Sequence, residues 1–289
     1  MNTRIIIDST TDIPKAFIQE YDILTLPLHI HVDGVEHIDG VTIHTNELYE
    51  KMKAGSIPKT SQVSIVDTRD TIEECLSQGE DVLYLAFSSH MSGTCSLVHS
   101  IMEALGEKYP GRKLCTLDSM GGSFATGLIA MRTAQKADAL PFDELVTYSQ
   151  FLIDHVEHLF TIDDLSWMIR GGRVSKTLGY TANLLNIKPV LDVQDGEMEV
   201  IHKIRGRKNA MKKVADLVAE RASGCRRQTI GITHADDIDA ANEMKELLKQ
   251  RLPECDFLIE EIGAVLGVYM GIGGVGVFFF NALPPSETN

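Results

Sequence analysis

The chain has 289 residues, of which 44% are apolar and 24% charged, a composition typical of a folded globular protein with room for two domains. Its 27 basic and 41 acidic residues give a formal net charge of −14, which disfavours nucleic acids and acidic membrane surfaces as partners. Five scattered cysteines without a C-x-x-C pair predict reduced thiols in a cytoplasmic protein rather than a disulfide framework or a zinc site.

The first half of the chain alternates continuous apolar runs with segments of helical periodicity. Continuous apolar runs are typical of strands buried on both faces of a sheet. The predicted strands are residues 4–10, 82–87 and 113–117, and the predicted helices begin at residues 12, 45, 64, 95 and 123. An extended segment at residues 22–32 ends in Asp33-Gly34, a hairpin turn signal. This alternation predicts a three-layer α/β/α domain with a parallel sheet over residues 1–150.

The pattern changes after Pro141. A helix over residues 142–156 is expected to lead into the second half. Further strands are predicted at residues 187–193, 198–205, 229–234 and 257–262, and helices at 208–222 and 238–252. The first two of these strands meet across Asp195-Gly196, a second hairpin signal. The pattern predicts an α+β domain with a mostly antiparallel sheet over residues 151–289.

Residues 264–285 carry no charged side chain and are nearly long enough to span a bilayer. The segment contains five glycines, and no lysine or arginine lies close enough to anchor its ends. A buried strand, a glycine turn and a second strand are expected instead, without stable membrane insertion. Residues 271–276 mimic a dinucleotide fingerprint, but an apolar run follows them where a helix would be required. The chain after Pro284 is expected to be disordered.

A hydroxyl-rich turn, residues 88–94, follows the predicted strand that ends at Phe87. A small polar loop between a parallel strand and a helix is a common ligand position in open α/β sheets. The first turn of the following helix offers free N–H groups that suit an anion. The alternative is that the hydroxyls cap the helix. Because Asp8-Ser9, Ser88-Ser89 and Asp118-Ser119 each end a predicted strand, one edge of the sheet is predicted to be polar.

Motifs for metal binding and autonomous catalysis are weak. His29 and His31 share one face of a strand, and His155 and His158 one face of a predicted helix, but no carboxylate pattern accompanies either pair. The sequence has no G-x-S-x-G elbow and no G-x-x-x-x-G-K-[ST] phosphate loop. The chain is therefore predicted to be a binding protein without a metal. A serine-dependent acyl hydrolase using Ser89 or Ser92 is the less favoured alternative.

Residues 163–213 carry ten basic and six acidic side chains, a local excess of positive charge in an acidic protein. A solvated helix face and strand-edge lysines account for part of it. Arg173 follows Gly171-Gly172, and Arg205 precedes Gly206, and glycine lets a backbone and a guanidinium approach a ligand closely. A phosphate-bearing or acidic partner is the functional interpretation of this segment.

Eight short motifs occur in one order along nearly the whole chain. The first half contains DSTTDIP (residues 8–14), PKTSQVS (58–64), SSHMSGT (88–94) and DS (118–119). The second half contains DDL (163–165), GGRVS (171–175), LNIKPVL (185–191) and KIRGRKNA (203–210). Together they resemble the DegV family, which includes the fatty-acid-binding subunits (FakB type) of bacterial fatty acid kinase.

The resemblance implies a non-enzymatic protein that binds a long-chain fatty acid, and no cofactor, in a buried pocket between two domains. It places the carboxylate on Thr60 and on a serine of the 88–92 turn. Ser89 is the favoured serine, and Ser61 and Ser92 are neighbouring candidates. Hydroxyl groups and a helix N-terminus can hold a carboxylate, while each buried methylene of the tail contributes roughly 0.8 kcal/mol.

Kinase-linked members of the family present the bound acid to an ATP-dependent kinase partner, which phosphorylates the carboxylate. Arg173 and Arg205 are expected near that partner or the phosphoryl group. This sequence has Tyr269 before its glycines, where the family commonly has histidine before G-P-G-x-x-G. Tyrosine can donate a hydrogen bond to the carboxylate or phosphoryl group, but it does not become a cation near neutral pH. A free-standing fatty-acid carrier without kinase coupling is therefore the alternative.

Overall fold

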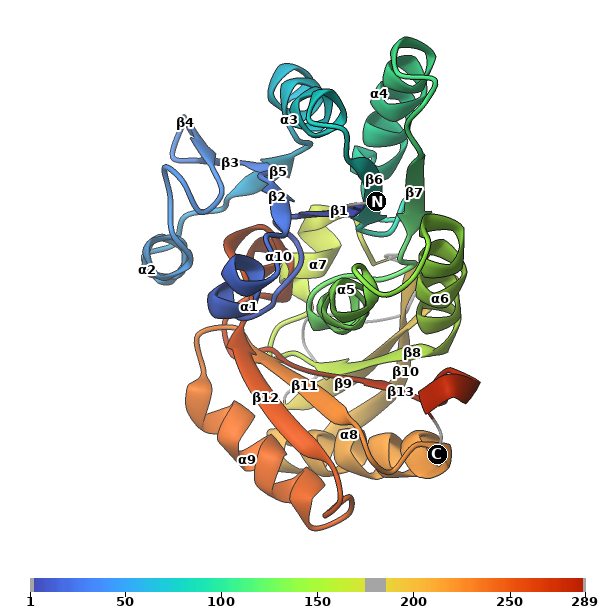
Figure 1. Cartoon of the computed structure of the whole chain (residues 1–289). Helices are drawn as coiled ribbons and strands as arrows, with labels where there is room; N and C mark the ends of the chain where they lie inside the picture. The colour runs from blue at the N-terminus through green and yellow to red at the C-terminus, as the bar shows by residue number, and fades with distance from the viewer. Residues whose placement is uncertain (1–2, 175–185, 288–289) are drawn as a thin grey trace.

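The computed structural model describes residues 3–174 and 186–287 (Figure 1). These residues form a four-stranded, a six-stranded and a three-stranded sheet, with helices around and between them. Ser175, Lys176 and Leu185, which belong to the motifs and the basic segment of the sequence, lie outside the described residues.

The four-stranded sheet is parallel, with the strand order β2-β1-β6-β7. Its strands are β1 (Thr3–Asp8), β2 (Leu24–Leu26), β6 (Asp81–Ala86) and β7 (Leu114–Asp118). Successive residues point to opposite faces, since Ile6 and Tyr84 join one buried cluster while Ile7 and Leu85 join another. One face packs on α3 (Ile65–Ser77) and α4 (Thr94–Lys108), the other on α5 (Phe124–Lys136) and α6 (Phe142–His155). The predicted three-layer α/β/α arrangement is confirmed.

A small antiparallel sheet, β4-β3-β5, extends from the first half of the chain. It consists of β3 (His29–Val32), β4 (Val35–Ile38) and β5 (Lys59–Ser61), with α1 (Lys15–Glu20) before it and α2 (Thr45–Lys53) before β5. Asp33 and Gly34 both have positive φ, as the predicted hairpin turn requires. His29 Nδ1 lies 2.9 Å from Glu36 Oε1, and the described residues contain no cluster suited to a metal ion.

The six-stranded sheet has the order β10-β9-β8-β13-β11-β12. Its strands are β8 (Val156–Thr161), β9 (Ile187–Gln194), β10 (Glu197–Arg205), β11 (Thr229–His234), β12 (Asp256–Glu261) and β13 (Val275–Phe280). All neighbours are antiparallel except β11 and β12. The outer face packs on α8 (Arg207–Arg221) and α9 (Ile238–Lys249), with a short turn, η2 (Ala222–Gly224), between them. The predicted mostly antiparallel sheet is confirmed.

Helix α5 lies between the two large sheets in Figure 1. Its Phe124 is fully buried and joins one cluster with Leu85 of the parallel sheet and Phe278 of the six-stranded sheet. A Cβ on Gly231 of β11 would lie 2.4 Å from the Phe124 ring, so glycine is needed there for the helix to approach the sheet. One hydrophobic core therefore joins both halves of the chain.

The uncharged segment at residues 264–285 differs from its prediction in its first part. Residues Ala264–Met270 form a helix, α10, rather than a strand, and β13 follows it after a glycine turn. A short apolar run that is buried on all sides has the same hydrophobic pattern as either element, so periodicity does not distinguish them. No helix of the described residues is both long enough and apolar enough to cross a membrane.

Two further predictions are wrong. His158 does not share a helix with His155, because α6 ends at His155 and His158 lies in β8. The chain after Pro284 is ordered through a short turn, η3 (Pro285–Glu287). Glu287 accepts a hydrogen bond from Tyr148 (2.8 Å) and pairs with Arg132, and these charge-assisted contacts hold the tail on the surface. Another helix, α7 (Ser166–Gly171), was not predicted.

Asp12 joins three distant segments. Its buried carboxylate accepts hydrogen bonds from Ser123 Oγ (2.6 Å) at the start of α5 and from the Gly263 N–H (2.8 Å) before α10. Burial raises the pKa of Asp12 from its ordinary value of 3.8 to about 7 because desolvation disfavours the charged form. Between pH 4 and pH 7, the unfolded chain is therefore ionised at this position while the folded chain is protonated.

We expect Asp12 to make the folded protein less stable as the pH rises from about 4 to 7, because the folded state binds the extra proton in that range. Asp12→Asn removes the titration, so its free energy of unfolding should fall less over this range than that of the wild type, by roughly 1–3 kcal/mol. Urea unfolding at several pH values measures this difference. Asp70→Asn, at an exposed position, is the control; equal slopes for Asp12→Asn and the wild type would contradict the prediction.

Candidate functional site

A buried carboxylate fixes the point where β6 enters the hydroxyl-rich turn. Asp8 is fully buried at the end of β1 and accepts hydrogen bonds from Tyr84 OH (2.8 Å) and the Phe87 N–H (3.0 Å). It also accepts from the N–H (3.0 Å) and the hydroxyl (2.5 Å) of Thr10. Four donors compensate the carboxylate for its loss of water. The backbone at Phe87 is consequently held in one position, and this position sets the path of the turn.

The three serines of the turn have different environments. Ser88 is buried, and its hydroxyl donates to the Gly196 carbonyl (2.8 Å) at the tip of the β9–β10 hairpin. Ser89 is exposed, and its backbone N–H donates to Asp118 (3.2 Å). Ser92 is half-buried, and its hydroxyl contacts Thr94 (3.0 Å). The residue before α4 is Gly93, without a side-chain cap, but Ser92 Oγ accepts the N–H of Thr94 (3.2 Å), the first residue of α4, so Ser92 satisfies one free N–H of the helix.

The chain just after Lys59–Ser61 packs directly on the hydroxyl-rich turn, because the turn has a glycine at the point of contact. A Cβ on Gly93 would lie 2.2 Å from Gln62 Nε2, so Gly93 lets the amide of Gln62 lie directly on the turn. Thr60, two residues before Gln62, has its hydroxyl 2.5 Å from the hydroxyl of Tyr269 in α10. Three segments that are distant in sequence thus meet at one position.

Arg173 completes this group. Its guanidinium lies 4.8 Å from the centre of the Tyr269 ring and donates to the carbonyls of Met91 (3.2 Å) and Gly171 (2.6 Å). A Cβ on Gly171 would lie 2.3 Å from the Tyr269 ring, so glycine is needed for the ring to pack there. A cation and three hydroxyls, those of Thr60, Ser92 and Tyr269, form a group suited to an anion such as a carboxylate.

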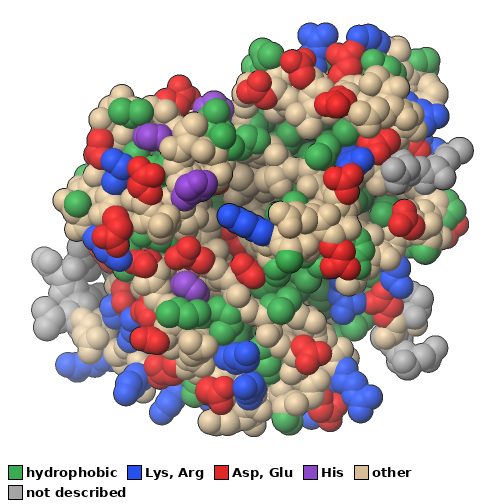
Figure 2. All heavy atoms as spheres, turned by 60° about the vertical axis from the view of Figure 1, so that its left-hand side comes forward, with side chains coloured by type: hydrophobic (Ala, Val, Ile, Leu, Met, Phe, Trp, Pro, Cys, Tyr) green, Lys and Arg blue, Asp and Glu red, His purple; other side chains and the backbone are tan. Residues whose placement is uncertain are grey.

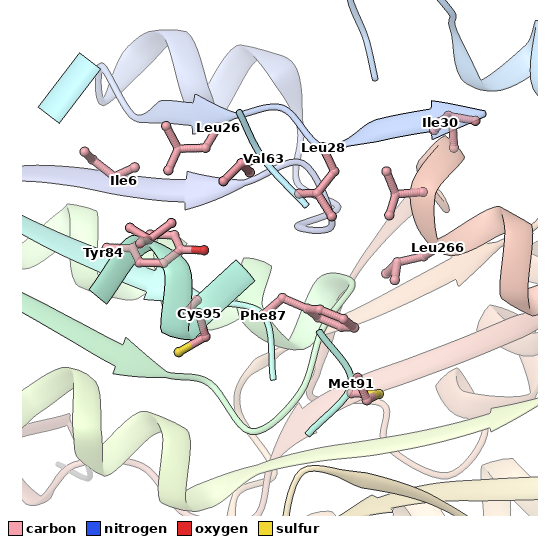
Figure 3. Close-up of a cluster of buried hydrophobic side chains, with 14 of the residues drawn as sticks. Ile6, Leu26, Leu28, Ile30, Val63, Tyr84, Phe87, Met91, Cys95 and Leu266 are labelled. Carbon is pink, nitrogen blue, oxygen red and sulfur yellow. The ribbon is translucent and has the colours of Figure 1, made fainter. Parts of the chain in front are cut away.

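These four side chains line a space of about 330 Å³, which we call the outer chamber. Its other lining residues are Leu28, Phe87, Met91, Met198, Val265 and Leu266. Figure 3 shows Phe87 and Met91, from one stretch of chain, near Leu28 and Leu266, which come from two other segments. The chamber therefore has both polar and apolar walls.

A second space of about 490 Å³, the inner chamber, is lined mainly by buried residues and shares five lining residues with the outer one. The shared residues are Phe87, Met91, Met198, Leu266 and Tyr269. The wall on the six-stranded sheet includes Phe160 and Phe278, and the four methionines around the chamber are Met91, Met168, Met198 and Met270. The two chambers therefore adjoin, with an anion-binding group in the outer one and apolar side chains around most of the inner one.

A groove of about 590 Å³ at the surface shares Thr60, Arg173 and Tyr269 with the outer chamber. It adds the cationic side chains of Lys59 and Arg170. The anion-binding group therefore lies between the apolar cavity and a positively charged groove.

The structure brings together four of the seven residues predicted for the site: Thr60, Ser92, Arg173 and Tyr269. The other three lie outside both chambers. Ser61 is exposed and its hydroxyl lies 3.0 Å from His31 Nε2, Ser89 is exposed, and Arg205 is exposed at the end of β10. His158 and Thr233 line the inner chamber but were not predicted, because no motif in the sequence marks a strand residue that faces a cavity.

The basic segment is partly neutralised. Arg207 contacts Asp237 (2.6 Å) and Asp163 (3.4 Å), and Lys188 contacts Asp163 (2.8 Å). In Figure 2, acidic and basic side chains are mixed over most of the face, and basic ones are prominent along its lower edge, at the height of α8 and α9. The positive charge that reaches the cavity comes from Arg173 and its neighbours in the groove.

The fold and the cavity define an α/β protein that encloses a largely apolar cavity beside the inner face of a six-stranded sheet. The chain belongs to the DegV family, whose family model, described as that of an uncharacterised protein, matches residues 2–282. A DegV domain-containing protein of Clostridium perfringens is 36% identical over 276 residues, which cover 94% of this chain and 95% of the relative. The resemblance inferred from the motifs is confirmed.

Solved structures of related proteins have the same fold. A DegV family protein from Thermus thermophilus, described by its fatty acid binding, has a TM-score of 0.87 at 26% identity over 97% of this chain and 99% of its own. DegV of Bacillus subtilis, a fatty acid binding protein, has a TM-score of 0.85 at 26% identity, with coverage of 97% and 99%. The Fatty Acid Kinase (Fak) B3 protein of Streptococcus pneumoniae, loaded with linoleic acid, has a TM-score of 0.85 at 20% identity, with coverage of 98% and 100%.

We expect Asp8→Ala to destabilise the protein, because it leaves the buried hydroxyl of Tyr84 and the N–H of Phe87 without an acceptor. The free energy of unfolding should fall by about 3 kcal/mol or more. Urea denaturation measures this change, and Asp70→Ala at an exposed position should alter it by less than about 0.5 kcal/mol. Equal effects of the two substitutions would show that Asp8 does not hold the turn.

Proposed function

We propose that this protein binds a long-chain fatty acid, with the carboxylate in the outer chamber and the alkyl chain in the inner chamber. The observation that carries the proposal is a pair of adjoining chambers, one with a cation and three hydroxyls and the other lined mainly by apolar side chains. Each methylene buried in such an interior contributes roughly 0.8 kcal/mol. The fatty acid binding named for the Thermus thermophilus and Bacillus subtilis relatives supports the same ligand class.

We also propose Thr60, Ser92, Tyr269 and Arg173 as the carboxylate-binding group. The sequence favoured Ser89, whereas the geometry favours Ser92, because Ser92 lines the outer chamber and Ser89 faces solvent. Hydroxyls that already lie close together, as those of Thr60 and Tyr269 do, bind a carboxylate with little loss of side-chain freedom. Ser61 and Arg205 are outside this proposal.

The positively charged groove supports a further step, presentation of the carboxylate to an ATP-dependent fatty acid kinase partner. Lys59, Arg170 and Arg173 line it next to the carboxylate-binding group, where cations would attract a phosphoryl donor. In this proposal the protein is a cytoplasmic lipid-binding subunit that has no catalysis of its own. Its two domains are residues 1–150 and residues 151–289. Tyr269, at the position where the family resemblance implies histidine, favours the second candidate, a carrier without kinase coupling.

The acyl hydrolase alternative has less support. Such an enzyme needs a histidine hydrogen-bonded to the nucleophilic serine. The hydroxyl of Ser92 donates to Thr94, and Ser89 contacts Asp118 through its backbone. Within residues 3–174 and 186–287, neither hydroxyl has a histidine partner.

We expect solvent extraction of the purified protein to release a C14–C18 acid in near-stoichiometric amount, detected by mass spectrometry. Thr60→Val and Ser92→Ala should each weaken binding of added acid by about tenfold or more, because each removes a hydroxyl that donates to a charged acceptor. Ser89→Ala is the matched control and should bind like the wild type. Loss of binding in Ser89→Ala alone would show that Ser89, and not Ser92, binds the carboxylate. A wild-type protein that binds no acid would refute the proposed function.

We expect the acid-loaded protein to yield an acyl phosphate when mixed with ATP and a bacterial fatty acid kinase catalytic subunit. Hydroxylamine traps the product as a hydroxamate that can be quantified. Arg173→Gln should lower hydroxamate formation by at least tenfold at saturating acid, because it removes a cation from the groove. A protein that retains its acid but gives no hydroxamate with kinase subunits from several related bacteria would favour the carrier.

A further inference from the structure

The inner chamber contains two buried polar groups that lack partners. His158 is 4% exposed and Thr233 is fully buried, and both line the chamber. Within the described part of the chain, His158 Nε2 and Thr233 Oγ1 have no hydrogen-bond partner. Buried polar side chains in proteins are almost always hydrogen-bonded, so two unpartnered groups on one apolar cavity indicate that something else supplies their bonds.

The strand register places both groups on the same face of the six-stranded sheet. Phe278 of β13 pairs with His158 of β8, and Gly276 of β13 pairs with Thr233 of β11. Residues two apart on a strand share a face, so His158 and Thr233 lie diagonally across β13. The ring of Phe278 packs edge-on against His158 at 5.9 Å between centroids. The two polar groups are therefore separate positions on one wall, with Phe278 between them.

Glycines lie directly against both unpartnered atoms. A Cβ on Gly276 would lie 2.9 Å from Thr233 Oγ1 and 2.8 Å from the Phe278 ring. Opposite, a Cβ on Gly121 would lie 1.9 Å from His158 Nε2, so the loop after β7 covers the imidazole closely without a side chain of its own. A side chain at either position would collide with the unpartnered atom beside it.

The charge state of His158 restricts what it can bind. Burial lowers its pKa to about 4, although Asp192 acts in the opposite direction. At neutral pH the imidazole is therefore uncharged and offers one donor and one acceptor. A neutral imidazole and a hydroxyl suit a neutral oxygen such as an alcohol, whereas the carboxylate is better held by Arg173 in the outer chamber.

We propose that the inner chamber binds a hydroxyl group carried on the alkyl chain, so that the preferred ligand is a fatty acid hydroxylated well away from its carboxylate. The inference rests on the proposed fatty-acid function and narrows its ligand class. His158 and Thr233 are already desolvated in the free protein, so a hydroxyl that reaches either of them gains a hydrogen bond without a further desolvation cost on the protein side. An unsubstituted chain leaves both groups unpaired.

The test is displacement of a bound fluorescent fatty acid by stearic acid and by its 2-, 10- and 12-hydroxy derivatives. We expect the 10- or the 12-hydroxy acid to bind the wild type about tenfold more tightly than stearic acid, a gain typical of one added hydrogen bond. The 2-hydroxy acid is the matched control, because its hydroxyl lies beside the carboxylate and should show no such gain.

The variant His158→Phe/Thr233→Val should keep a cooperative thermal unfolding transition, which shows that it folds, and should lose the preference, so that it binds the hydroxy acid no more tightly than stearic acid. Equal affinities of the wild type for all four acids would overturn the inference and leave fatty-acid binding intact, with a buried water as the partner of the two groups. A preference that survives in the double variant would also overturn it. Failure of every acid to bind would overturn the proposed function as well.

Discussion

The site depends on one buried carboxylate, that of Asp8, and on the four hydrogen bonds it accepts. These bonds fix the end of β6, and the turn that follows then reaches two other segments. Ser88 bonds to the tip of the β9–β10 hairpin, and the carbonyl of Met91 accepts from Arg173. Charged hydrogen-bonded networks of this kind are strong when every lone pair has a donor and costly when one is lost. The positions of the hairpin and the guanidinium thus depend on a side chain that contacts neither of them.

Glycine sets how closely the remaining parts approach one another. Gly171 admits the ring of Tyr269, Gly93 admits the amide of Gln62, and Gly231 admits Phe124 of α5. In each case a Cβ would lie within 2.5 Å of the neighbouring side chain, so any other residue would separate two segments. The cavity exists because α5 joins the two sheets into one core while leaving the ends of the parallel strands free beside the inner face of the second sheet.

The fold was largely predictable from the sequence because its signals are local. Continuous apolar runs marked β1, β6 and β7, and Asp33-Gly34 and Asp195-Gly196 marked two hairpins. The first part of the 264–285 segment was predicted wrongly because a fully buried helix and a fully buried strand have the same apolar pattern. The choice between Ser89 and Ser92 depends on the backbone path of a turn held by Asp8 and Gly196, which no local pattern encodes. His158 and Thr233 meet the cavity through strand pairing between distant segments, and this pairing is not local either.

Four of the chain's eleven methionines line the inner chamber. The thioether side chain is unbranched and polarisable, so a wall built from it can follow chains of different curvature without breaking specific contacts. The same wall is chemically vulnerable, because oxidation to the sulfoxide places a polar oxygen in the apolar chamber. The capacity of such a cavity to hold an apolar chain therefore depends on whether its surroundings oxidise these methionines.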